Sequence, residues 1–355
     1  MIEIKYIGMD VHQASTSVAV LNEAGKLIME ATIRTEATAV LEFFNGIRGS
    51  LYVAFEESTQ AQWLYDLLVP KVSKVVVCDP RQLASHKTAN KSDRIDARKL
   101  AQALRSGDLK PVYHQRTALG TLPQLAASYV QLSNDATRTM NRLKAIYRAR
   151  AIGCAGARVY SSKSRSQWLE RLQETGARRR AERLYAQLDA VVALRKQARQ
   201  EMVVEGRRHS AYPVLRSIPQ LGPVRVALLL ALLKTPHRFR SKRQLWTYAG
   251  LSLVTRSSAD HEWINGELQR TRRPVFVLGL NSNYNHAVKS VFKGAATGAL
   301  RREGPWRDFY LRRTAQGMRH SLALVTLARK IAAVTLSVWK KGEPFEAEHL
   351  KSQAA

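Results

Sequence analysis

Four carboxylates in the first third of the chain have the positions expected of metal ligands. Asp10 ends the apolar run YIGMD, and Glu56 ends a second apolar run, SLYVAFE. Asp93 and Asp96 lie three residues apart in SDRIDARKLAQAL, and residues at i and i+3 share one face of a helix. Four uncompensated negative charges in one cleft repel strongly, so their convergence would require divalent cations. Oxygen ligands favour Mg²⁺ or Mn²⁺, and two such ions about 3.5–4 Å apart are the usual arrangement for phosphodiester chemistry.

An acid at the end of a first strand also occurs in ATP-using kinases of the actin and sugar-kinase kind. In those kinases, Gly and hydroxyl residues follow the aspartate and let the hairpin wrap the phosphates of ATP. Here Asp10 is followed by Val11, His12 and Gln13, and no glycine occurs until Gly25. The chain also lacks a second strand-rich half that could close over a nucleotide. The sequence therefore favours a metal ligand at Asp10 over a nucleotide site.

The segments that carry these acids alternate between strand and helix patterns. In chain order, the expected strands are residues 5–11, 15–22, 26–34, 50–56 and 73–79, and the expected helices are residues 37–47, 61–69 and 92–107. Ser92 can cap the last helix, and Gly107 suits its C-terminal end. A three-stranded meander followed by strand, helix, strand and helix predicts a ribonuclease H-like α/β domain at residues 1–115, with helices covering a mixed sheet.

Residues 119–208 have little strand signal and a helical pattern. Apolar and small residues follow alternating spacings of three and four, as in a coiled-coil seam: Tyr129, Leu132, Ala136, Thr139, Leu143 and Ile146. We expect two antiparallel helices with a bend near residues 153–166. They would form either a stalk that dimerises or a simple intramolecular hairpin.

Residues 209–345 predict a mostly helical C-terminal domain, so the predicted fold class is α/β followed by α. SIPQLGP suggests a helix-hairpin-helix, whose turn amides can face a phosphate backbone, or else a plain turn between helices. SKRQLWTYAGL predicts a short helix, followed by a loop rich in Ser, Arg and Asp and a long closing helix at residues 318–342. Residues 346–355 are expected to be a flexible tail.

The charge of the chain is its most unusual property. Lys and Arg number 57 against 28 Asp and Glu, which gives a net charge of +29. Such an excess predicts strong, salt-dependent attraction to nucleic acid, with an anionic membrane surface as the rival. No uninterrupted apolar run of about 18 residues or signal peptide is evident, and Cys78 and Cys154 form no CxxC motif. We therefore expect a soluble, cytoplasmic protein associated with the nucleoid and not with a membrane.

With the acids placed, the chain resembles the DEDD transposases of bacterial insertion sequences, a family that includes the Piv-type DNA invertases. YIGMDVH, VAFEES and NKSDRIDARKLAQAL are similar to its three acidic motifs. The resemblance continues through SIPQLGPVRVALLLALL and LWTYAGL to KKGEPFEAE. It implies a RuvC-like nuclease domain, a coiled-coil linker and a C-terminal transposase domain. The metal ligands would be Asp10, Glu56, Asp93 and Asp96.

The resemblance also implies a serine nucleophile in the third domain, eight residues after the glycine of a GL pair. Counting from Gly250 gives Ser258, with Ser257 as the alternative. Ala259 follows where the family has glycine, and NGELQRTRRPVF replaces a Lys-rich segment.

The implied activity is the cutting and rejoining of DNA strands through a covalent 5′-phosphoserine intermediate. The implied partners are double-stranded DNA (the element ends and a target) and a structured guide RNA, of the kind that bridge recombinases use. A homodimer or tetramer would let the acids and the serine come from different protomers.

Two other functions stay open on the sequence alone. A junction-resolving nuclease would use the same acids with water as the nucleophile and would release free phosphate ends. A degenerate copy would bind nucleic acid without reacting and would gain little from Mg²⁺.

Overall fold

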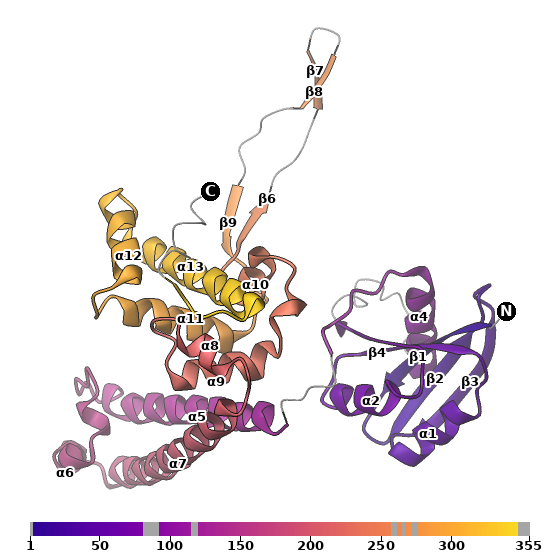
Figure 1. Ribbon diagram of the computed structural model, residues 1–355. Coiled ribbons are helices and arrows are strands. Elements are labelled where there is room, and N and C mark those ends of the chain that lie inside the picture. The colour runs from indigo at the N-terminus through magenta and orange to yellow at the C-terminus, as the bar shows by residue number, and fades with distance from the viewer. Residues whose placement is uncertain are drawn as a thin grey trace. The chain divides into compact units, whose positions relative to one another are not determined.

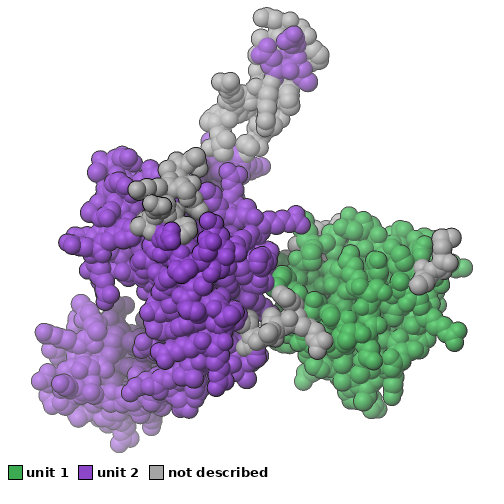
Figure 2. All heavy atoms as spheres, viewed as in Figure 1, with its two compact units in different colours: residues 1–118 green, residues 119–355 purple. Residues whose placement is uncertain are grey.

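A computed structural model of the chain describes residues 3–80, 92–114, 120–256, 261–264, 267–270 and 276–346. The chain divides into two compact units, residues 1–118 and residues 119–355 (Figure 2). Each unit has a hydrophobic core of its own.

Unit 1 is built on a five-stranded mixed sheet (Figure 1). Its strands and helices follow in the order β1 (Ile4–Val11), β2 (Ser15–Leu21), β3 (Leu27–Arg34), α1 (Ala37–Asn45), β4 (Ser50–Glu56), α2 (Ala61–Leu68), β5 (Lys74–Cys78) and α4 (Asp93–Ser106). The strand order is β3-β2-β1-β4-β5, in which β1, β2 and β3 pair antiparallel while β4 pairs parallel with both β1 and β5. The strands and helices predicted around the acids are confirmed, with ends that differ by two residues at most.

Helices cover both faces of this sheet. On one face, Ile7 and Met9 are fully buried in a cluster with side chains of α1 and α2. On the other face, α4 lies directly against β1 at Gly8. The predicted ends of α4 are confirmed: the side chain of Ser92 accepts a hydrogen bond from the Ile95 amide, and Gly107 ends the helix in the left-handed conformation at φ 79°. The cap and the packing fix where the first turn of α4 lies above β1.

Replacing Gly8 with alanine is expected to destabilise the protein. An added Cβ would lie 2.1 Å from the Ala97 carbonyl oxygen and 2.5 Å from the Ala101 amide nitrogen, so α4 would have to move away from β1. Overpacking of this kind costs about 1–3 kcal/mol of unfolding free energy, and urea unfolding would measure it. Gly46→Ala is the matched control, because its new Cβ would meet nothing closer than 3.5 Å at an ordinary φ of −76°. Equal stability of the two variants would contradict the proposed close packing.

Two long helices, α5 (Leu122–Arg148) and α7 (Thr175–Arg207), begin unit 2, with the short α6 (Arg165–Glu170) between them. They run antiparallel, because Tyr147 near the end of α5 contacts Tyr185 near the start of α7. Of the predicted seam, four residues are buried and two are half-buried: Ala136, Thr139, Leu143 and Ile146, then Tyr129 and Leu132. The two helices form an intramolecular hairpin, and its dimerisation stays a prediction.

The rest of unit 2 is a helical cluster with two small antiparallel ribbons. The helices are α8 (Tyr212–Arg216), α9 (Pro223–Leu233), α10 (Lys242–Tyr248), α11 (His286–Ala299), α12 (Pro305–Ala315) and α13 (His320–Lys341). The strands are β6 (Leu253–Arg256), β7 (His261–Ile264), β8 (Glu267–Arg270) and β9 (Phe276–Leu280), with β6 paired to β9 and β7 to β8.

The prediction of a loop between α10 and the closing helix was therefore wrong. Polar residues dominate that stretch, but LVTR and FVLGL carry the β-branched and aromatic residues that favour strands. Their pairing joins segments some twenty residues apart, so no local pattern reveals it. The predicted closing helix is confirmed as α13 and ends at Gly342 with φ 73°.

α13 is long and apolar enough to cross a membrane by length and composition alone. However, residues such as Leu327, Ile331 and Val334 are fully buried in the core of unit 2. Burial of this kind is typical of a core helix, and a core helix can have the length and the apolar composition of a membrane-spanning helix.

Candidate metal centre

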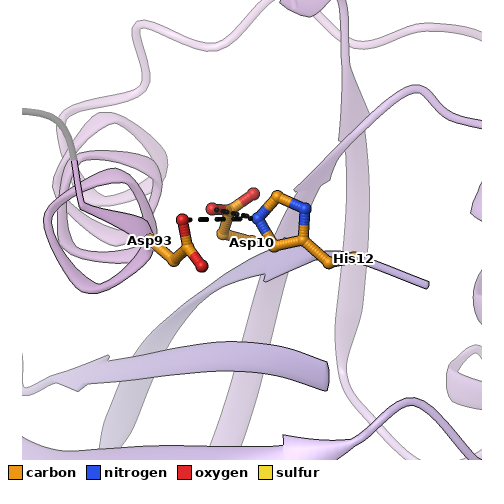
Figure 3. Close-up of side chains that lie close together, drawn as sticks. All are labelled: Asp10, His12 and Asp93. Carbon is orange, nitrogen blue, oxygen red and sulfur yellow. Dashed lines mark hydrogen bonds and ion pairs between the residues drawn. The ribbon is translucent and has the colours of Figure 1, made fainter. Parts of the chain in front are cut away.

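Asp10, His12 and Asp93 converge where β1 ends and α4 begins. Nε2 of His12 lies 3.2 Å from Oδ2 of Asp10 and 3.5 Å from Oδ1 of Asp93. One potential ligand atom from each residue lies within 4.8 Å of the other two. Figure 3 shows both carboxylates directed at the same nitrogen of the imidazole ring. Two carboxylate oxygens and an imidazole nitrogen at this spacing form a donor set suited to a divalent cation.

The main chain holds these three side chains in place. Asp10 follows Gly8 by two residues, and alternation along β1 places it on the face that α4 covers. The His12 amide donates to the Ser15 carbonyl, and the hydroxyl of Thr35 donates to the His12 carbonyl. Asp93 is the first residue of α4, directly after its N-cap.

The electrostatics of Asp10 favour a cation. Its side chain is only 18% exposed, and burial raises its pKa above the ordinary value for aspartate. The charge of His12 opposes this rise, whereas the negative charges of Asp93 and Asp96 add to it. An ionised Asp10 is thus under strain from desolvation and from two neighbouring carboxylates, and a bound cation would relieve both.

Asp96 and Glu56 flank this cluster. Asp96 lies one turn along α4 from Asp93, acts on the charge of Asp10, and is within 3.5 Å of the Lys99 ammonium. Glu56 is the last residue of β4. Met9 of β1 pairs with Phe55 of β4, so Asp10 and Glu56 are the next residues on the two strands. The two acids therefore end neighbouring parallel strands on the same face of the sheet, with the strands about 4.8 Å apart.

Residues next to Glu56 fix its surroundings. The buried thiol of Cys78 lies opposite Glu56 on β5, and burial, with the charge of Glu56, raises its pKa to about 12. Cys78 is therefore a neutral thiol at neutral pH in the metal-free protein. Glu57 is 41% exposed, and its Oε2 lies 2.6 Å from Nε2 of the buried His114 side chain. This contact anchors the chain directly after Glu56.

His12 is the site residue that the sequence did not identify. In the sequence it is one of the non-glycine residues that follow Asp10. A signal did exist, because a histidine two residues after a strand-end aspartate continues the alternation and faces the same way.

The predicted serines, Ser257 and Ser258, lie outside the described residues. The structure describes the chain that leads to them. Arg329 of α13 donates from Nε to the Leu251 carbonyl at 2.5 Å. Gly250 has φ 63°, and a Cβ there would lie 2.4 Å from the ring of Tyr284. The GL pair from which the serine position was counted is therefore a tightly packed turn that opens β6.

Comparison with known proteins identifies the family. Residues 7–149 match a family described as transposases, of the DEDD and IS110 type, and residues 212–311 match the transposase IS116/IS110/IS902 family. Together the two ranges include more than half of the chain, with the acidic cluster in the first. The chain belongs to the IS110-type DEDD transposases. The predicted family is therefore confirmed.

Two proteins from insertion elements of Streptomyces are similar to this chain. A protein of insertion element IS116 from Streptomyces clavuligerus is 31% identical over 117 residues, which are 33% of this chain and 26% of the relative. A protein of insertion element IS110 from Streptomyces coelicolor is 29% identical over 138 residues, which are 39% of this chain and 31% of the relative. The matches thus span less than a third of either relative's length.

Proposed function

We propose that this IS110-type transposase cuts and rejoins DNA strands at the ends of its insertion sequence and at a target. The observation that carries the proposal is the convergence of Asp10, His12 and Asp93, with Asp96 and Glu56 at adjoining positions. Asp10, Glu56, Asp93 and Asp96 would hold Mg²⁺ or Mn²⁺, and the imidazole of His12 would complete or orient the ligand set. When bound, these ions stabilise the negative charge that develops on a phosphate during displacement.

The topology of unit 1 supports a ribonuclease H-like, RuvC-like assignment. Its strand order β3-β2-β1-β4-β5, with an antiparallel meander and two parallel strands, places the first strand in the middle of the sheet. A central first strand carries Asp10 to the end of the sheet where Glu56 ends β4, and α4 brings Asp93 to the same place. A RuvC-like metal site would use this arrangement.

The strand-exchange step that we propose uses Ser258, or Ser257 in its place. The hydroxyl oxygen attacks the phosphorus, the bond from phosphorus to the 3′ oxygen breaks, and a 5′-phosphoserine ester forms. The serine proton passes to a base, and the departing 3′ oxygen takes up a proton. Attack by another strand's 3′ hydroxyl on the ester then rejoins the DNA and restores the serine. The proposal also includes a structured guide RNA and a dimer or tetramer, which the resemblance to this family supports.

Metal-dependent cleavage tests the proposal. Purified protein, co-purified RNA and labelled DNA carrying the element ends should give cut strands with Mg²⁺ or Mn²⁺, and intact strands with EDTA. Cut strands with free phosphate ends and no protein attached would instead support the junction-resolving nuclease. Binding with no cutting under any metal would support the degenerate copy.

Affinity for nucleic acid is expected to fall steeply with salt. The net charge of +29 provides many lysines and arginines to replace counterions on phosphates. Each phosphate contact contributes a slope of roughly 0.9 in log K against log salt for duplex DNA. Titrations of labelled duplex at several salt concentrations would measure the slope. Binding that is flat between low and physiological salt would indicate a small apolar interface instead.

A further inference from the structure

A cleft in unit 2 has features that the proposed reaction does not use. It is open to solvent, has a volume of about 940 Å³, and lies between the two long helices on one side and the first turns of α9 and α11 on the other. Each of the four helices contributes side chains to the lining of the cleft, for example Tyr129 of α5, Arg195 of α7, Arg225 of α9 and His286 of α11. Cavities of roughly 300–1,000 Å³ enclose ligands of small-molecule size.

All the ionised side chains that line the cleft are positively charged. Its lining includes four permanent cations, Arg195, Lys196, Arg199 and Arg225, and no Asp or Glu. In the parts of the chain that the structure describes, none of the four makes an ion pair. Four cations around one concavity repel each other, and a polyanion that enters it relieves the repulsion.

Arg225 is the most constrained of the four. Its Nη1 donates to the Gln220 carbonyl at 2.8 Å. A Cβ at Gly294 of α11 would lie 3.2 Å from its Nη2, so the guanidinium lies close along the glycine surface of that helix. Burial lowers its pKa, and a half-buried cation without a carboxylate partner is unfavourable unless an anion joins it. The amides at the starts of α9 and α11 add partial positive charge at the same wall.

The other lining residues suit a base or a sugar. Tyr129, Val130, Val192, Val224 and Leu228 give the cleft an apolar surface beside its cations. Proteins that bind single strands combine these two features, since cations follow the phosphates while aromatic and apolar side chains contact the unstacked bases. A volume of about 940 Å³ leaves room for one or two unpaired nucleotides.

We propose that this cleft binds an unpaired stretch of nucleic acid, with Arg195, Arg199 and Arg225 on its phosphates and Tyr129 against a base. The inference rests on the proposed function only in taking nucleic acid as the partner. It adds a single-strand site built from residues of unit 2 alone.

Binding by the full-length chain would test this, read as fluorescence anisotropy of labelled oligonucleotides. The probes are single-stranded RNA, single-stranded DNA of the same sequence, and the DNA duplex, all in EDTA so that no cutting occurs. The double variant Arg195→Gln with Arg199→Gln removes two cations of the cleft. Arg179→Gln with Arg183→Gln is the matched control, because both are exposed, four residues apart on the same helix and outside the cleft.

The cleft variant should lose on the order of tenfold in single-strand affinity. Its slope of log K against log salt should fall by about 1.4, because each of the two lost phosphate contacts contributes roughly 0.7 to that slope for single strands. The duplex should lose much less, and the control variant should lose little on either single strand. A loss on RNA or on DNA identifies which strand the cleft prefers, and either supports the proposal. Equal losses in the two variants would overturn it, because they would reflect net charge alone.

Ser290→Trp separates shape from charge. Ser290 is exposed at the cleft, so tryptophan can fill the space without disturbing the core or changing a charge. Its single-strand affinity should fall by a similar factor with an unchanged melting temperature, and parental affinity would overturn the proposal. Because these experiments use no metal, failure here leaves the cleavage test unaffected, and failure of cleavage leaves the cleft result unaffected.

Discussion

Asp93→Asn is expected to abolish strand cleavage while DNA binding stays near that of the parent. The carboxylate of Asp93 is directed at the same imidazole nitrogen as Asp10, so it would be a direct ligand of the catalytic ions. Loss of an outer-shell partner already costs about 10–100-fold in metal affinity or activity, and loss of a ligand should cost at least the upper value. Cleavage rates with Mg²⁺ on labelled element ends would measure the effect. Asp96→Asn should behave in the same way.

The melting temperature of Asp93→Asn without metal provides a second measurement. Because the pKa of Asp10 is raised in the folded chain, the folded state binds more protons than the unfolded state between the ordinary and the raised pKa. Metal-free protein should therefore gain stability as the pH falls through that window and lose it as the pH rises. Asp93→Asn removes one of the charges that act on Asp10, so its melting temperature in EDTA should stay level or increase.

Asp66→Asn is the matched control for this experiment. Asp66 is exposed on α2, where it accepts a hydrogen bond from Gln62, and α2 packs on the opposite face of the sheet. This variant should cleave at the parental rate. Cleavage near the parental rate by Asp93→Asn would remove Asp93 from the site. A large loss of melting temperature would instead show that its carboxylate has a structural role.

The acids of unit 1 could be predicted because local patterns determine their positions. Asp10 and Glu56 end apolar runs that have the length of strands, and Ser92 and Gly107 mark the two ends of α4. His12 was missed because the second carboxylate that it meets, Asp93, is 81 residues away, and its spacing from Asp10 alone does not reveal a shared site. The same holds for Glu57, whose partner His114 comes from beyond β5.

Unit 2 was harder to predict for a related reason. The long helices have strong periodicity, and α13 has an apolar run that needs no partner to be recognised. The ribbon of β6 and β9 depends on pairing across a polar segment, which composition does not encode. No pattern in the residues singles out Ser258, and only the family resemblance identifies it. The serine therefore needs an experiment of its own.

Ser258→Ala is expected to bind DNA and metal normally yet form no covalent adduct. Cutting and rejoining without an external energy source requires an intermediate that conserves the phosphodiester bond. Attack by water would lose that bond, whereas attack by a serine hydroxyl stores it as an ester that a 3′ hydroxyl can later displace. A protein–DNA adduct on denaturing gels, sensitive to protease and linked to a 5′-phosphate, would measure the intermediate.

Ser257→Ala is the matched control, because it removes the same hydroxyl one residue earlier in the chain. Only one hydroxyl attacks the phosphorus, so the variant that keeps this hydroxyl should lose less adduct than the variant that removes it. An adduct that persists in Ser258→Ala and vanishes in Ser257→Ala would move the nucleophile by one residue and leave the mechanism intact. If both variants recombine at parental rates, no serine ester lies on the pathway. The acids would then have to direct water, and energy for rejoining would have to come from a 3′ hydroxyl attacking an intact strand.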